Sequence, residues 1–140
     1  MGQTLKVHVE QIGPSATRVS VRSHAALVDR PVAKGGTDQG PLGGEYLLVA
    51  LGGCFASNLL AAIHARSAAI AEVHVDVSGT LESAPDQFSA FTLDVTARHD
   101  DLEQLRKLVD IASRACAVTN TLRRAAPVTV LCEGSPIPSA

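Results

Sequence analysis

The segment from Tyr46 to Ile63 is apolar on nearly every side when it is drawn as a helix. A helix of this kind must be buried on several faces or lie within a membrane. Because Ser57 and Asn58 interrupt the apolar run, we expect the buried central helix of a soluble domain, over about residues 45–66. The larger residues of its apolar surface are Leu47, Leu48, Leu51, Cys54, Phe55 and Leu59.

The length of 140 residues predicts one domain over residues 1–140, with a loose, Pro/Ser-rich tail at 133–140. A net charge of −2 gives no electrostatic reason to expect a nucleic acid or an anionic membrane as a partner. The N-terminus lacks the apolar stretch of a signal peptide. Three cysteines without metal-type spacing suit a reducing compartment, so we expect a cytoplasmic protein without a metal.

Strands are expected on both sides of the helix, because apolar and polar residues alternate there. Residues 24–28 either extend the strand expected at 16–22 or form the third strand of an N-terminal β-meander. Residues 34–44 are too rich in glycine for a regular element and form a loop. The alternating stretches are residues 4–12, 16–22, 70–82, 88–99 and 128–132.

A second helix is expected after residue 100, with Asp100 or Asp101 as its N-cap and an apolar stripe that ends near Cys116. A short helical turn is expected at 120–124. The resulting order, βββ–α–ββ–α–β, indicates an α+β fold with a largely antiparallel sheet.

Gly52 and Gly53 lie inside the first helix, where each costs about 1 kcal/mol relative to alanine. Tight packing within one chain would offset this cost, and so would a close helix–helix contact between two chains. We expect the second arrangement, an obligate two-fold homodimer that buries well over roughly 2,000 Å² in total. On this hypothesis, Gly53→Leu disrupts folding or assembly.

Cys54 and Cys116 are either inert packing residues or a redox pair. A cysteine in the middle of a helix lacks the N-terminal dipole that lowers a thiol pKa, so a reactive Cys54 would need a nearby cation. The candidates are Arg18, Arg22 and Arg30. Cys132 is interpreted as structural, and the five histidines show no metal-binding motif.

Three segments taken together resemble the OsmC/Ohr superfamily of osmotically inducible and organic hydroperoxide resistance proteins: Gly35–Pro41, Glu45–Cys54 and Cys116–Leu122. The resemblance covers roughly residues 18–132. It implies an intertwined homodimer whose long central helices are wrapped by sheets from both subunits. It also implies a peroxidatic Cys54, a resolving Cys116, organic hydroperoxides as substrates, and an external dithiol or lipoyl-type reductant. No metal, haem or flavin is implied.

One position departs from the peroxidase branches, which have a glutamate ten residues before the peroxidatic cysteine. Here that residue is Gly44, and Glu45 is turned by about 100° around the helix axis. This pattern is closer to a broader OsmC-like branch. Arg22 is our first choice for the arginine beside Cys54, and Glu45 is a second candidate site residue.

Two other functions stay open at this point. One is a protein of the same fold with little or no peroxidase activity, which binds a small molecule or senses redox state. The other is a hotdog-type acyl-binding protein, in which neither cysteine has a role.

Overall fold

The computed structural model describes residues 2–138 and divides the chain into two compact units, Met1–Leu47 and Leu48–Ala140. From the sequence we expected a single domain. The central helix α1, Gly43–Ala65, begins in the first unit and continues through the second. The predicted α+β fold class is confirmed, and the expected elements occur in the expected order. The helical turn expected at 120–124 is a helix at Ala117–Leu122, and a final short strand at Ser135–Pro136 was not expected.

The N-terminal unit is a three-stranded antiparallel sheet in the order β1–β2–β3, which confirms the predicted meander. The strand expected at 4–12 begins only at residue 8. A short 3-10 helix, η1, lies at Val32–Lys34, directly before the predicted loop at 34–44 and overlapping it only at Lys34. The strands are β1 at His8–Gln11, β2 at Thr17–Val21 and β3 at His24–Val28.

A buried carboxylate, Asp29, organises the loop that leads to α1. It is 2 % exposed and accepts hydrogen bonds from the hydroxyls of Ser15 and Thr37, at 2.8 and 2.7 Å. The backbone N–H groups of Arg30 and Gln39 donate to it at 2.6 and 3.1 Å. These hydrogen bonds, that of the Thr37 hydroxyl first, outweigh the effect of burial and hold the pKa of Asp29 far below its usual range.

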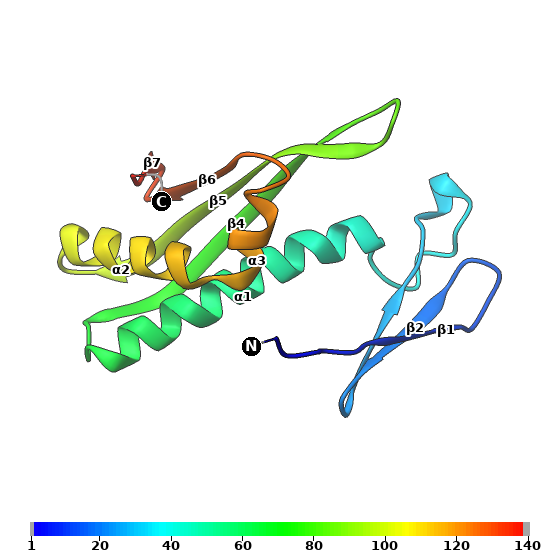
Figure 1. The fold of residues 1–140 in the computed structure, drawn as a ribbon, viewed down its shortest axis with the longest axis horizontal. Coiled ribbons are helices and arrows are strands. Elements are labelled where there is room, and N and C mark those ends of the chain that lie inside the picture. Colours follow the sequence, from blue (N-terminus) through cyan, green and yellow to red (C-terminus); the bar gives the residue numbers. More distant parts are fainter. Residues whose placement is uncertain (1, 139–140) are drawn as a thin grey trace. The chain divides into compact units, whose positions relative to one another are not determined.

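The second unit contains a four-stranded sheet in the order β4–β5–β6–β7 (Figure 1). The long strands β4 and β5 are antiparallel, whereas β5 and β6 are parallel. The parallel pair arises because α2 and α3 form a crossover between those two strands, and parallel neighbours need such a connection. The elements are β4 Ile70–Glu82, β5 Gln87–His99, α2 Leu102–Ala115, α3 Ala117–Leu122, β6 Val128–Cys132 and β7 Ser135–Pro136.

The tail expected to be loose from residue 133 is docked as far as residue 137. β7 pairs with β6, and the Ile137 N–H donates to the carbonyl of Val130 at 3.1 Å. The side chain of Ile137 is buried. Residues 139–140 of that tail lie outside the described residues.

The core of this unit lies between one face of the sheet and the helices. On β5 the inward positions are Phe91, Leu93 and Val95, all buried. Helix α2 runs alongside β5 and β6 and covers this face (Figure 1). The helix begins at the predicted cap, because the Asp101 carboxylate accepts from the Gln104 N–H at 3.2 Å.

Helix α1 buries one face only within a single chain. Leu51, Phe55 and Leu59 are fully buried, whereas Val49 is 60 % exposed and Leu60 is 54 % exposed. By length and composition α1 could also cross a membrane, a criterion that core helices of soluble proteins meet as well. We predicted that the helix is buried on several sides. Within one chain it is buried on one side only.

Candidate functional site

Cys54 lies on α1 and is partly buried. The amide nitrogen of Asn58, one turn later on the helix, donates to the Cys54 carbonyl at 2.9 Å. The same nitrogen lies 3.8 Å from the Cys54 sulfur. Asn58 therefore places a polar donor beside a thiol that the sequence set on an apolar helix face.

Cys116 occupies the corner between α2 and α3 and is fully buried. Its backbone is extended, with φ −73° and ψ 114°, so that α2 ends there and α3 starts in a new direction. The Cys116 N–H still donates to the Ala112 carbonyl, at 3.0 Å. Its sulfur acts as the N-cap of α3 and accepts from the Thr119 N–H at 3.5 Å.

Three groups of this corner influence the ionisation of Cys54. Burial opposes ionisation of Cys54 and is the largest single influence on its pKa. The backbone N–H of Val118, the Cys116 thiol and the backbone N–H of Ala117 each favour the thiolate. Together these donors outweigh burial, so that the pKa of Cys54 lies below its ordinary value.

The second thiol is shifted in the opposite direction. Burial raises the pKa of Cys116, and the Thr119 N–H, which donates to its sulfur, only partly counters this. A negative charge on Cys54 raises the pKa of Cys116 further. The environment thus shifts the pKa values of two identical groups in opposite directions, which favours the thiolate at Cys54 and the neutral thiol at Cys116.

Sequence reasoning placed the two cysteines in functional motifs but missed the donors. It assigned the stabilisation of the thiolate to a cation, because Cys54 is far from the N-terminus of its own helix. The structure adds backbone N–H groups at the start of α3, which favour the thiolate without a cation. Their only sequence signal was their position directly after Cys116.

The other candidate residues lie in the N-terminal unit. Arg22 is exposed at the β2–β3 turn with φ 53°, and Arg18 lies 3.7 Å from Glu10 in an exposed ion pair. The Glu45 carboxylate accepts from the Leu42 N–H at 2.8 Å and so caps the start of α1. The proposed roles of Arg22 and Glu45 beside Cys54 stay predictions.

Cys132 is buried on β6, where burial raises its pKa. This agrees with its interpretation as a structural residue. Within residues 2–138, no group of three or more metal-binding side chains comes together.

An apolar groove of about 440 Å³ runs between α1 and β4. A Cβ atom added to Gly52 would lie 2.6 Å from Val77 of β4, so the glycine permits close packing within the chain. A Cβ atom at Gly53 would meet nothing within 4 Å. The two glycines therefore face different surroundings. The groove is lined by Leu48, Val49, Gly52, Gly53, Ala56, Val73, Val75 and Val77.

Residues 36–131 match the model of a family described as OsmC-like protein. No curated protein matches the chain. Among solved structures, an OsmC-like protein from Mycoplasma pneumoniae is similar at a TM-score of 0.80 and 18 % identity, over 94 % of this chain and 99 % of that one.

Two organic hydroperoxide resistance proteins have the same fold. The protein from Legionella pneumophila is 16 % identical, with a TM-score of 0.72 over 93 % of this chain and 96 % of that one. The protein from Elizabethkingia anophelis is 18 % identical, with a TM-score of 0.73 over 96 % of this chain and 99 % of that one.

Proposed function

Because the chain belongs to the OsmC-like protein family, we propose that it is a thiol-dependent peroxidase that reduces organic hydroperoxides and serves in peroxide defence in the cytoplasm. The observation that carries this proposal is that Cys54 of α1 and Cys116 at the α2–α3 corner are neighbours, in surroundings that shift their pKa values in opposite directions. Organic hydroperoxide resistance proteins of the same fold supply the substrate class.

In the first step the Cys54 thiolate attacks the terminal oxygen of the hydroperoxide. A sulfur–oxygen bond forms and the oxygen–oxygen bond breaks, which leaves Cys54 as a sulfenic acid and releases an alkoxide. The alkoxide takes a proton and leaves as the alcohol. The sulfur is oxidised by two electrons and the peroxide is reduced by two.

In the second step the Cys116 sulfur attacks the Cys54 sulfur, and a disulfide and one water form. Once Cys54 has become a neutral sulfenic acid, the charge that raised the pKa of Cys116 is gone. Cys116 then loses its proton more easily than before the first step. An external dithiol, such as a lipoyl-type reductant, exchanges with the disulfide and restores both thiols.

The test uses cumene hydroperoxide with dihydrolipoamide, followed by peroxide consumption and intact-mass analysis. We expect turnover and a Cys54–Cys116 disulfide in the wild-type chain. Cys54→Ser should abolish turnover. Cys116→Ser should stop at oxidised Cys54, and Cys132→Ser serves as the matched cysteine control. A wild-type chain that consumes no peroxide and forms no disulfide would contradict the proposal.

A redox-sensing or small-molecule-binding protein is the second candidate. Gly44 occupies the position of the glutamate in the peroxidase branches, and the Glu45 carboxylate caps α1. This candidate is favoured if the disulfide forms once with peroxide but dihydrolipoamide supports no repeated turnover. A hotdog-type acyl-binding function would give the two cysteines no role, which does not fit the opposite shifts of their pKa values.

The functional form is a homodimer in this proposal. The groove between α1 and β4 leaves the side chain of Val49 and the backbone at Gly53 open to a partner surface. A second copy of α1 would cover both, because small residues allow close helix approach. Light scattering should give the mass of two chains at every dilution that permits measurement. A single-chain mass that persists in concentrated solution would exclude the dimer.

A further inference from the structure

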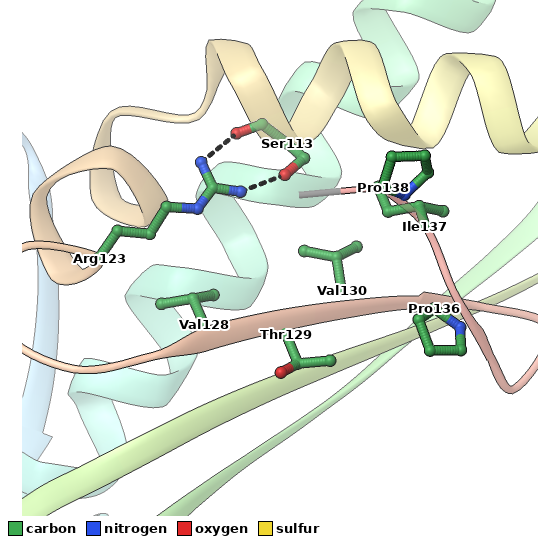
Figure 2. Close-up of a pocket in the computed structure, with 8 residues that line it drawn as sticks. All are labelled: Ser113, Arg123, Val128, Thr129, Val130, Pro136, Ile137 and Pro138. Atoms are coloured by element: carbon green, nitrogen blue, oxygen red, sulfur yellow. Dashed lines mark hydrogen bonds between the residues drawn. The ribbon is translucent and has the colours of Figure 1, made fainter. Parts of the chain in front are cut away.

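The side chain of Arg123, the residue that follows α3, returns to Ser113 near the end of α2 (Figure 2). The Arg123 guanidinium donates to the Ser113 hydroxyl at 2.5 Å and to the Ser113 carbonyl at 3.4 Å. The Asn120 amide donates to the Arg114 carbonyl at 3.0 Å. These carbonyls belong to the last turn of α2, where backbone acceptors have no partner within their own helix.

The same guanidinium also fixes Asn120. Arg123 donates to the Asn120 side-chain oxygen at 3.2 Å, so the two α2-binding side chains are linked to each other. Within residues 2–138 Arg123 has no carboxylate partner, and its charge instead complements the negative C-terminal end of α2. We call Ser113, Asn120 and Arg123 the corner clamp.

A cavity of about 110 Å³ lies beside the clamp (Figure 2). The walls include Val128 and Val130 of β6 and the docked Ile137. Close packing normally fixes the angle between adjacent elements, and a void provides no such contact on its side. On this side, therefore, the corner between α2 and α3 is held by hydrogen bonds more than by packing.

We propose that Arg123 is a positioning residue for the Cys54–Cys116 pair, because it holds the start of α3 in the orientation that aims its N–H groups and the Cys116 thiol at Cys54. This inference rests on the proposed peroxidase function for its catalytic consequence. Its structural part, the orientation of donors at Cys54, applies to the reduced protein alone.

The geometry explains why a distant guanidinium matters to the thiolate. None of the groups that shift the pKa of Cys54 belongs to Arg123, so the residue acts through α3 and not through its own charge. Hydrogen bonds weaken steeply with misalignment. A small rotation of α3 into the adjacent cavity would turn the donors of Ala117 and Val118 away from the sulfur.

The test compares Arg123→Ala and Arg123→Lys with Arg124→Ala, which removes a neighbouring charge that makes no side-chain hydrogen bond within residues 2–138. The reduced proteins are alkylated with iodoacetamide across a pH series, and thermal melting is recorded in parallel. We expect both Arg123 variants to raise the apparent pKa of Cys54, with about threefold or greater loss of alkylation rate at neutral pH, the scale of one weakened hydrogen bond. Arg124→Ala should match the wild type.

A second readout follows the fate of oxidised Cys54 after cumene hydroperoxide. A misplaced Cys116 resolves the sulfenic acid more slowly, so the Arg123 variants should show a larger sulfinic fraction by intact mass than Arg124→Ala. Ser113→Ala removes the hydroxyl but keeps the carbonyl acceptor, so it should raise the apparent pKa of Cys54 by an intermediate amount. It replaces Arg123→Ala as the test variant if Arg123→Ala does not fold.

Three outcomes would overturn the inference. One is a lower melting temperature with the alkylation profile of the wild type, which would make Arg123 purely structural. Another is recovery of the wild-type profile in Arg123→Lys, which would assign the effect to charge. The third is an equal effect of Arg124→Ala. If the Arg123 variants shift the alkylation of Cys54 but neither the wild type nor any variant turns over peroxide, the proposed peroxidase function fails and the positioning role of Arg123 stands.

Discussion

The backbone N–H of Thr119 donates to the Cys116 sulfur at 3.5 Å, and the same sulfur faces Cys54. The proposed resolving atom is therefore also the N-cap acceptor of α3. When the disulfide forms, the Cys116 sulfur shares with Cys54 an electron pair that could otherwise accept the hydrogen bond at the start of α3. Redox state and the stability of α3 are coupled through this one sulfur.

Replacing Cys116 tests the capping role separately from the redox role. Cys116→Ser and Cys116→Ala both remove the thiol and are similar in size, but only serine can accept from the Thr119 N–H. We expect the alanine variant to be less stable by about 1 kcal/mol, the usual cost of losing an N-cap. Urea unfolding of the two variants measures the difference. Equal stability would show that the cap contributes nothing.

The reactivity of Cys54 should rise with pH through a midpoint below that of an ordinary thiol, because its folded-state pKa is lowered. Cys116→Ala removes one donor and should move the midpoint upward, which leaves less thiolate at neutral pH. Iodoacetamide alkylation across a pH series, in a Cys132→Ser background, provides the measurement. A midpoint that does not move would exclude the Cys116 thiol as a donor to Cys54.

The two adjacent glycines of α1 should respond differently to substitution. Gly52→Ala places a Cβ atom 2.6 Å from Val77, and the valine cannot move away easily because it is branched next to the backbone. We expect it to destabilise the chain at every protein concentration, by about 1–3 kcal/mol as for other overpacked cores.

Gly53→Leu differs, since a Cβ atom at Gly53 has open space within a single chain. We expect the secondary structure to be retained and the dimer to dissociate on dilution where the wild type does not. Circular dichroism and light scattering over a dilution series separate the two effects. An undiminished dimer would argue against a partner at this part of the groove.

Asp29 should make the N-terminal unit sensitive to acid. Its folded pKa is depressed below the ordinary value of 3.8, so its stabilising effect is complete above that pH and is lost as the pH falls toward the folded pKa. Asp29→Asn should therefore cost most at neutral pH, lowering the melting temperature by several degrees, and the difference from wild type should shrink in acid.

Hydrogen exchange at the amides of Arg30 and Gln39, which donate to the carboxylate, reports the effect locally. Asp38→Asn is the matched control, because Asp38 is exposed on the same loop and asparagine tolerates its φ of 54°. Equal protection in all three proteins at neutral pH would show that Asp29 does not organise the loop.

Local pattern predicted the elements that depend on neighbouring residues. Alternation along β4 and β5 predicted two long strands, and the structure places them at nearly the expected bounds. Asp101 was one of two candidates for the cap of α2 and is the residue that caps it. These features follow from contacts within a few residues, which sequence periodicity records directly.

Sequence by itself therefore determined the order of the elements and the two cysteine motifs. Tertiary structure alone decided that β5 and β6 are parallel, and that Ala117 and Val118 supply the donors for Cys54. The physical reason is that these contacts depend on where the α2–α3 crossover returns to the sheet. That path is set by packing and by the corner clamp. Neither produces a repeating pattern in the sequence from which these contacts could be predicted.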